Sequence, residues 1–202
     1  MLNKKLGETK IVCILVVILQ CMVIIFWGTQ KEGLFTDEVF SYEGAKKLGL
    51  GMQYWSYEEG FYSSYHTKAE FMERITVEKE DLLIYQPEEL KEAFASRDLY
   101  YTILNLAHSF YPGHFTIWTG ILLNLPFFIF LQFILYKTVY YILSDRVAAV
   151  TVMSIYGFSA GAISLVLYPR CYMMLTTFLL LAFYIYLLYM EQKTFWNRMI
   201  YL

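Results

Sequence analysis

One apolar stretch near the N-terminus restricts this chain to a small set of folds. Residues 11–28 (IVCILVVILQCMVIIFWG) contain Gln20 as their only strongly polar side chain. A helix needs about 20 mostly apolar residues to cross a hydrocarbon core of about 30 Å. Three lysines precede the stretch, and the sequence around its end, FWGTQK, has no small-x-small cleavage pattern. We therefore predict a retained membrane anchor rather than a cleaved signal peptide.

Three later stretches, at residues 114–136, 147–167 and 171–190, have the same apolar character. Hydrophobic residues make up 58% of the chain and charged residues 17%, against the usual shares of about 45–50% and about 25%. This composition excludes a disordered chain and a disulfide scaffold. Residues 99–111 are apolar but too short to cross, which favours an interfacial or re-entrant helix. The predicted fold class is all-α, a polytopic membrane helix bundle with about four transmembrane helices, as a single membrane domain over residues 1–202.

A long polar insert, residues 29–113, separates the first span from the others and holds most of the 18 acidic residues. The positive-inside rule predicts a cytoplasmic N-terminus. That orientation makes the insert the first outer loop, and a plasma membrane is the predicted location. The net charge of −2 and the pI of 5.9 give no argument for a nucleic-acid partner. The basic residues that this orientation places inside are Lys4, Lys5, Lys10, Lys137, Arg146, Lys193 and Arg198.

Short interfacial helices are predicted in the outer loop. Thr36 followed by two acids favours an N-cap and the first turn of a helix that ends near Leu48. A second helix is predicted over residues 67–74. A third, over residues 87–94, would begin with Pro87 and two glutamates, which suit a helix start. The aromatic residues of the loop would pack onto the membrane face.

The acidic pair Asp37-Glu38, just beyond the first span, is the first candidate for chemistry. Helix capping alone explains such a pair, with a stabilisation of about 1 kcal/mol. The functional interpretation is a carboxylate held at the membrane face that takes a proton from an acceptor hydroxyl or amine. Capping is the simpler of the two explanations.

Two further candidates contain arginine. Arg170, with Tyr172, lies at the outer end of the last span, where a guanidinium either snorkels into lipid headgroups or binds a phosphate. Arg97 and Asp98, where the insert returns to the membrane, form either a local ion pair or a secondary site. The three histidines and three cysteines have no metal-ligand spacing, and no phosphate-binding loop or dinucleotide fingerprint is present.

The order of these elements resembles the N-terminal part of the GT-C glycosyltransferases. The resemblance starts with one span and an outer loop that opens with the acidic motif GLFTDEVFSY, and it continues with Asp98-Leu-Tyr-Tyr. Next come residues 106–118 (LAHSFYPGHFTIW), then Asn124, and finally Arg170-x-Tyr172. It covers nearly the whole chain, although each motif is short.

The resemblance implies a function and roles for these residues. Enzymes of this family take a sugar from a polyprenyl-phosphate carrier on the outer side of the membrane and pass it to a lipid, glycan or protein acceptor. Asp37 would be the catalytic base with Glu38 as its acidic neighbour, and Arg170 with Tyr172 would contact the donor phosphate. Transfer would invert the anomeric configuration. No organic cofactor is implied, and a divalent metal is left open.

The chain has fewer predicted spans than the family that it resembles. Members of this family usually have about eleven or more spans, so we expect this chain to correspond to the N-terminal portion of a longer enzyme. A transporter or flippase-like protein, with the insert as a gate, is the first alternative. A non-enzymatic membrane protein whose aromatic loop binds a partner is the second.

Overall fold

Every regular element in the described part of the chain is a helix. The computed structural model describes residues 2–46, 65–88, 90–91 and 99–200. Contacts divide the chain into two units. We call the first the spanning unit (Met1–Lys31, Asn124–Leu167 and Cys171–Leu202) and the second the insert unit (Glu32–Leu123 with Tyr168–Arg170).

The spanning unit contains the helices that are long and apolar enough to cross a membrane. They are α1 (Leu2–Thr29), with a candidate span at Thr9–Thr29, α8 (Trp118–Leu143), which belongs to this unit from Asn124 onward, and α11 (Tyr172–Ile200), with a candidate span at Tyr172–Gln192. Apolar side chains such as Leu15 and Leu179 are more than half exposed on them. Exposed apolar surface of this extent suits contact with lipid rather than water. The length and composition of these helices indicate a membrane protein.

The predicted third span, over residues 147–167, is interrupted by a break. Residues 146–167 form two helices, α9 (Arg146–Gly157) and α10 (Ala160–Leu167), bent by 56° at the break between them. Ser159 accounts for the break, because its Oγ donates to the Tyr156 carbonyl at 2.6 Å and accepts from the Ala162 N–H at 3.2 Å. This side chain satisfies backbone groups that a continuous helix would pair internally. The pair counts as a fourth crossing only if it is one broken span.

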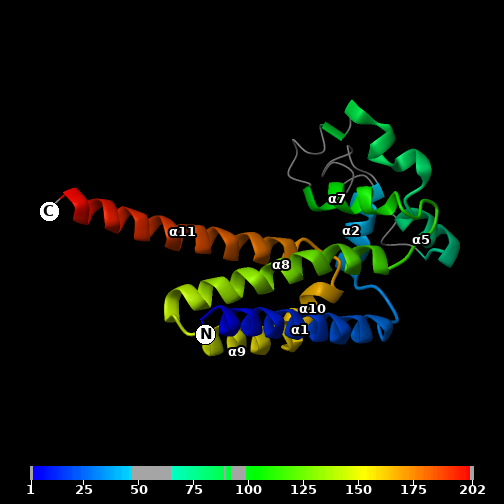
Figure 1. Ribbon diagram of the computed structural model, residues 1–202. Helices are drawn as coiled ribbons and strands as arrows, with labels where there is room; N and C mark the ends of the chain where they lie inside the picture. Colours follow the sequence, from blue (N-terminus) through cyan, green and yellow to red (C-terminus); the bar gives the residue numbers. More distant parts are fainter. Residues whose placement is uncertain (1, 47–64, 89, 92–98, 201–202) are drawn as a thin grey trace. The chain divides into compact units, whose positions relative to one another are not determined.

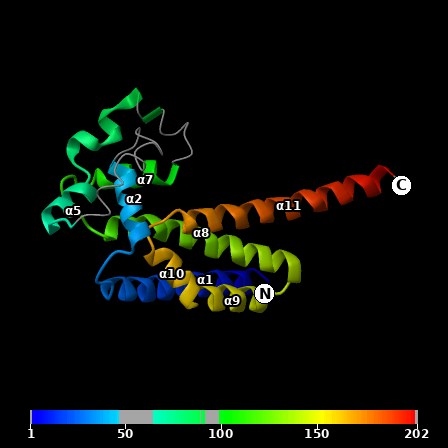
Figure 2. The same ribbon diagram turned by 180° about the vertical axis from the view of Figure 1, so that it is seen from behind.

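The apolar core of the spanning unit joins all of its helices. Both α9 and α10 pack against α1 (Figure 1), and the reverse view shows the same arrangement (Figure 2). Between the helices, fully apolar side chains form two buried clusters. The larger contains Ile24, Phe128, Leu131, Ala162, Val166 and Met173, and the smaller contains Cys13, Val17 and Met153.

The insert unit folds around α2 (Thr36–Lys46) and α7 (Leu99–His108). Gly44 allows their close approach, because a Cβ there would stand 3.3 Å from the Tyr101 ring. The buried Asn105 side chain of α7 makes three hydrogen bonds. It donates to the carbonyls of Ala45 and Asp81, both at 2.8 Å, and accepts from the Leu83 N–H at 3.0 Å. One amide thus fixes α7 to the end of α2 and to the short helices η1 (Lys79–Asp81) and η2 (Leu83–Tyr85).

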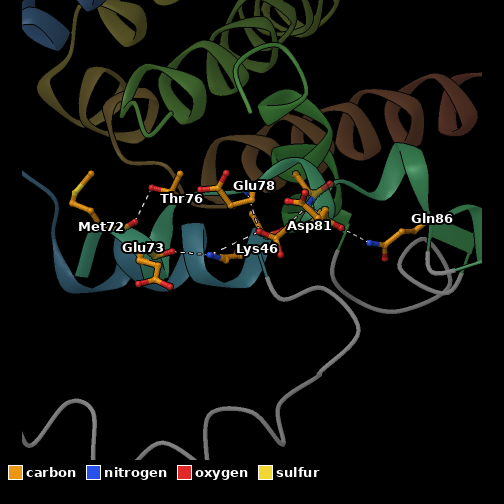
Figure 3. A network of polar contacts seen from close by, with 10 residues as sticks. Lys46, Met72, Glu73, Thr76, Glu78, Asp81 and Gln86 are labelled. Carbon is orange, nitrogen blue, oxygen red and sulfur yellow. Dashed lines mark hydrogen bonds and ion pairs between the residues drawn. The ribbon is translucent and has the colours of Figure 1, made fainter. Parts of the chain in front are cut away.

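Helix α5 (Lys68–Ile75) joins the same unit through charged side chains. Its N-cap Thr67 forms a capping box with Glu70, so the predicted helix over residues 67–74 is confirmed. Arg74 donates to the carboxylate of Glu43 of α2, and both side chains are buried. Figure 3 shows a second link, in which Lys46 Nζ donates to the Glu73 carbonyl at 2.7 Å.

Two other helices predicted in the insert are confirmed in part. The predicted helix over residues 99–111 is present as α7 but ends at His108. Residues 87, 88, 90 and 91 are helical, and the rest of the predicted helix over residues 87–94 lies outside the described residues. That these helices lie at a membrane interface, and that the N-terminus is cytoplasmic, stay predictions.

Candidate functional site

The candidate site is built on the first turn of α2. Thr36 is the first residue of this helix, and the carbonyl of Phe35 accepts from the N–H groups of Glu38 at 2.9 Å and Val39 at 3.2 Å. The N-cap is therefore Phe35, one residue before the predicted Thr36. The carboxylate of Glu38, three residues into the helix, reaches back to the N-cap, where its Oε2 accepts from the Phe35 N–H at 2.8 Å. Glu38 is fully buried in this role.

Asp37 points the other way and is exposed. Two residues from the segment between α10 and α11 reach it. The Tyr168 hydroxyl donates to Asp37 Oδ2 at 3.0 Å, and Arg170 Nη1 donates to the backbone carbonyl of Asp37 at 2.8 Å. The Tyr168 ring also lies 5.9 Å from the Phe35 ring. The structure thus brings the predicted acid and the predicted cation together, although they are 133 positions apart in the sequence.

Glycine at position 120 lets this segment approach. A Cβ on Gly120, in the first turn of α8, would overlap the Pro169 ring and lie 2.8 Å from the Tyr42 hydroxyl oxygen. Pro169 is buried against that surface, with Tyr168 and Arg170 on either side of it. Packing of Pro169 on Gly120 therefore positions both polar side chains beside Asp37.

Tyr42 fixes α2 to the same place. It is fully buried, and its hydroxyl donates to the Ile117 carbonyl at 3.0 Å. Its ring packs edge-on against Phe115 at 4.9 Å and His108 at 5.8 Å. Burial raises the pKa of Tyr42 well above its usual value, so the hydroxyl stays a donor. The first turn of α2, and with it Asp37, is thereby held against the start of α8.

The electrostatics of the site favour a protonated Tyr168. Removal of its hydroxyl from water raises the pKa of Tyr168, and the hydrogen bond to Asp37 and the negative charge of Asp37 raise it further. A phenol with a raised pKa is neutral at physiological pH and donates its proton to the carboxylate. The site therefore combines two charged groups. The carboxylate of Asp37 is held by the Tyr168 hydroxyl, and the guanidinium of Arg170 is bound to the backbone carbonyl of Asp37.

Of the remaining predicted site residues, the structure describes only Tyr172. Tyr172 begins α11 in the spanning unit and is 40% exposed. Arg97 and Asp98 lie outside the described residues, so the secondary site stays a prediction. In the part of the chain that the structure describes, no three His, Cys, Asp or Glu side chains converge as metal ligands.

Sequence reasoning missed the contacts that assemble the site. Tyr168 was not expected to hold Asp37, and neither Gly120 nor Tyr42 was singled out. A tyrosine directly before Pro-Arg and a glycine within an apolar helix are the only local signals for them. A glycine in such a helix indicates close approach of another segment, but it does not identify the segment.

Comparison of the chain with protein-family models, with curated proteins and with solved structures finds no match. The resemblance to the GT-C glycosyltransferases therefore rests on the sequence motifs alone. The roles that it implies for Asp37 and Arg170 are proposals.

Proposed function

We propose that this chain is the N-terminal portion of a GT-C-like membrane glycosyltransferase. The enzyme would transfer a sugar from a polyprenyl-phosphate donor to a lipid, glycan or protein acceptor on the outer face of the cell membrane. The observation that carries the proposal is the site around Asp37. An exposed carboxylate at a helix N-terminus is held by Tyr168, and the guanidinium of Arg170 is fixed to the same residue.

In the proposed reaction, the oxygen of an acceptor hydroxyl attacks the anomeric carbon of the donor. Asp37 takes the proton of that hydroxyl. Because Tyr168 donates to Oδ2, the proposed proton acceptor is the other carboxylate oxygen, Oδ1. The bond from the anomeric carbon to the phosphate oxygen breaks, and its electron pair leaves with the polyprenyl phosphate. A single displacement of this kind inverts the anomeric configuration.

Arg170 would stabilise the departing phosphate. A guanidinium has five N–H donors and stays charged at any physiological pH. Its bond to the Asp37 carbonyl orients the guanidinium beside the proposed base. Glu38, which the resemblance placed in the acidic pair, is proposed here as a positioning residue, since its carboxylate caps α2.

The test measures sugar transfer by the full-length protein in membranes, with a panel of radiolabelled polyprenyl-phosphate hexoses and pentoses. We expect Asp37→Asn to lower transfer by about 100-fold or more, the usual effect of losing a general base. Glu88→Gln is the matched control, because Glu88 is a well-exposed acid of the insert unit that pairs only with Lys91 in the described contacts. Its transfer rate should equal that of the wild type.

A second variant separates the two charged roles. Arg170→Ala should raise the donor KM more than the acceptor KM, because the guanidinium is assigned to the donor phosphate. Undiminished transfer by Asp37→Asn, at wild-type protein levels, would remove Asp37 from the reaction. Absence of transfer by the wild-type protein with every donor of the panel would instead favour a transporter or flippase-like protein, for which the broken α9–α10 pair is the supporting observation.

A further inference from the structure

Three helices of the spanning unit bring polar side chains to one place. Gln20 of α1 and Gln132 of α8 are both fully buried. Their amide groups occupy the position that a Cβ would take on Gly157, the last residue of α9. Tyr156 precedes this glycine. Lack of a side chain at Gly157 therefore leaves room for two amides between the helices.

The cluster lies near the middle of each span. Gln20 is close to the midpoint of Thr9–Thr29, and Gln132 is close to the midpoint of Trp118–Leu143. Tyr156 and Gly157 stand at the break that divides Arg146–Leu167 into α9 and α10. Lipid tails offer no hydrogen bonds at this depth, so polar groups must find partners inside the protein.

The hydrogen bonds within the cluster are incomplete. Gln20 Nε2 donates to the Met153 carbonyl at 3.1 Å. Among the described residues, no partner is found for Gln20 Oε1 or for either amide atom of Gln132. Exchanging the oxygen and nitrogen of Gln20 would lose the bond to the Met153 carbonyl.

The chemistry of these groups defines the ligand. Gln132 contributes a donor and an acceptor, and Gln20 contributes an acceptor. Because the two uncharged amides offer both kinds of atom, they favour a small neutral molecule that both donates and accepts. A buried water molecule typically makes about three hydrogen bonds to groups of this kind.

We propose that Gln20 and Gln132 bind water at the middle of the helix bundle, beside the break between α9 and α10. Non-helical backbone at membrane depth is tolerated where it is buried in protein or lines a water-filled cavity. The bound water would supply the missing partners of the two amides. This site is separate from the Asp37 site, and the proposal does not depend on sugar transfer.

X-ray radiolytic footprinting of the full chain in lipid nanodiscs tests the proposal. Hydroxyl radicals formed from bound water oxidise the side chains next to it. Met153 is fully buried beside the cluster, and Met173 is equally buried within the larger apolar cluster, which makes it the matched control. We expect Met153 to be oxidised about ten-fold faster than Met173, because only the polar cluster can order a water.

A variant identifies the ligand groups. Gln132→Met removes both unpartnered amide atoms while keeping a similar side-chain volume, and it should reduce the oxidation rate of Met153 to that of Met173. Equal rates for the two methionines in the wild type would overturn the proposal without any variant. An unchanged Met153 rate in a folded Gln132→Met protein would overturn the assignment of Gln132.

Discussion

Lowering the pH should destabilise the insert unit, because its buried His108 resists protonation. This histidine is the last residue of α7 and only 1% exposed, and its ring lies 5.8 Å from that of Tyr42. No partner for its Nε2 atom is found among the described residues. Burial without a partner lowers the pKa of His108 from 6.5 to about 4. The folded unit therefore binds this proton less readily than the unfolded chain does.

The sign and size of the effect follow from the two pKa values. Above pH 6.5 the imidazole is neutral in both states, and the unit has its full stability. As the pH falls from 6.5 towards 4, the unfolded chain takes up a proton that the folded unit refuses. The free energy of unfolding should fall by about 2 kcal/mol between pH 7 and pH 5, and by about 3 kcal/mol in all once the pH is below 4.

Pulse proteolysis across a urea series, in detergent and with cleavage sites in the insert unit, measures this free energy at each pH. His108→Gln removes the titrating group, so its stability should fall about 2 kcal/mol less than that of the wild type over the same interval. Equal pH dependence of the two proteins would refute the argument. A wild-type unit that is more stable at pH 5 than at pH 7 would refute it as well.

Two further substitutions test the packing of the insert unit. Glu43→Gln should lower its free energy of unfolding by about 3 to 5 kcal/mol, because the charge of Arg74 would stay buried without its counter-charge; a denaturation midpoint equal to that of the wild type would contradict this. Gly120→Ala should displace Pro169 and, under the proposed function, lower sugar transfer by about ten-fold or more. Wild-type transfer by this variant would show that the Pro169 contact does not position the site.

Hydropathy alone predicted the long helices, because a run of apolar residues at membrane length has few other stable conformations. It did not predict the break at Ser159. The small residues of that stretch suit close helix packing, and a serine forms local hydrogen bonds only where the surrounding helices allow the backbone to bend. Predicting the break required the tertiary structure.

The candidate site, too, could be predicted only in part from the sequence. Asp37 and Arg170 could be singled out by residue type and by their positions just outside predicted spans. Their arrangement could not, because Tyr168 and Asp37 are 131 positions apart. The contact between Tyr168 and Asp37 depends on Gly120, because only a residue without a side chain leaves room there for Pro169. Nothing in the local sequence specifies which segment fills that space.

Attachment of Arg170 to the main chain of Asp37, rather than to its carboxylate, has a practical consequence. The anchor of the guanidinium is kept in any variant of position 37 that preserves the first turn of α2. The two charged side chains can thus be varied one at a time, each in an otherwise intact background. Under the proposed function, D37N protein would be a stalled enzyme that still holds its donor, suited to trapping the lipid carrier for identification.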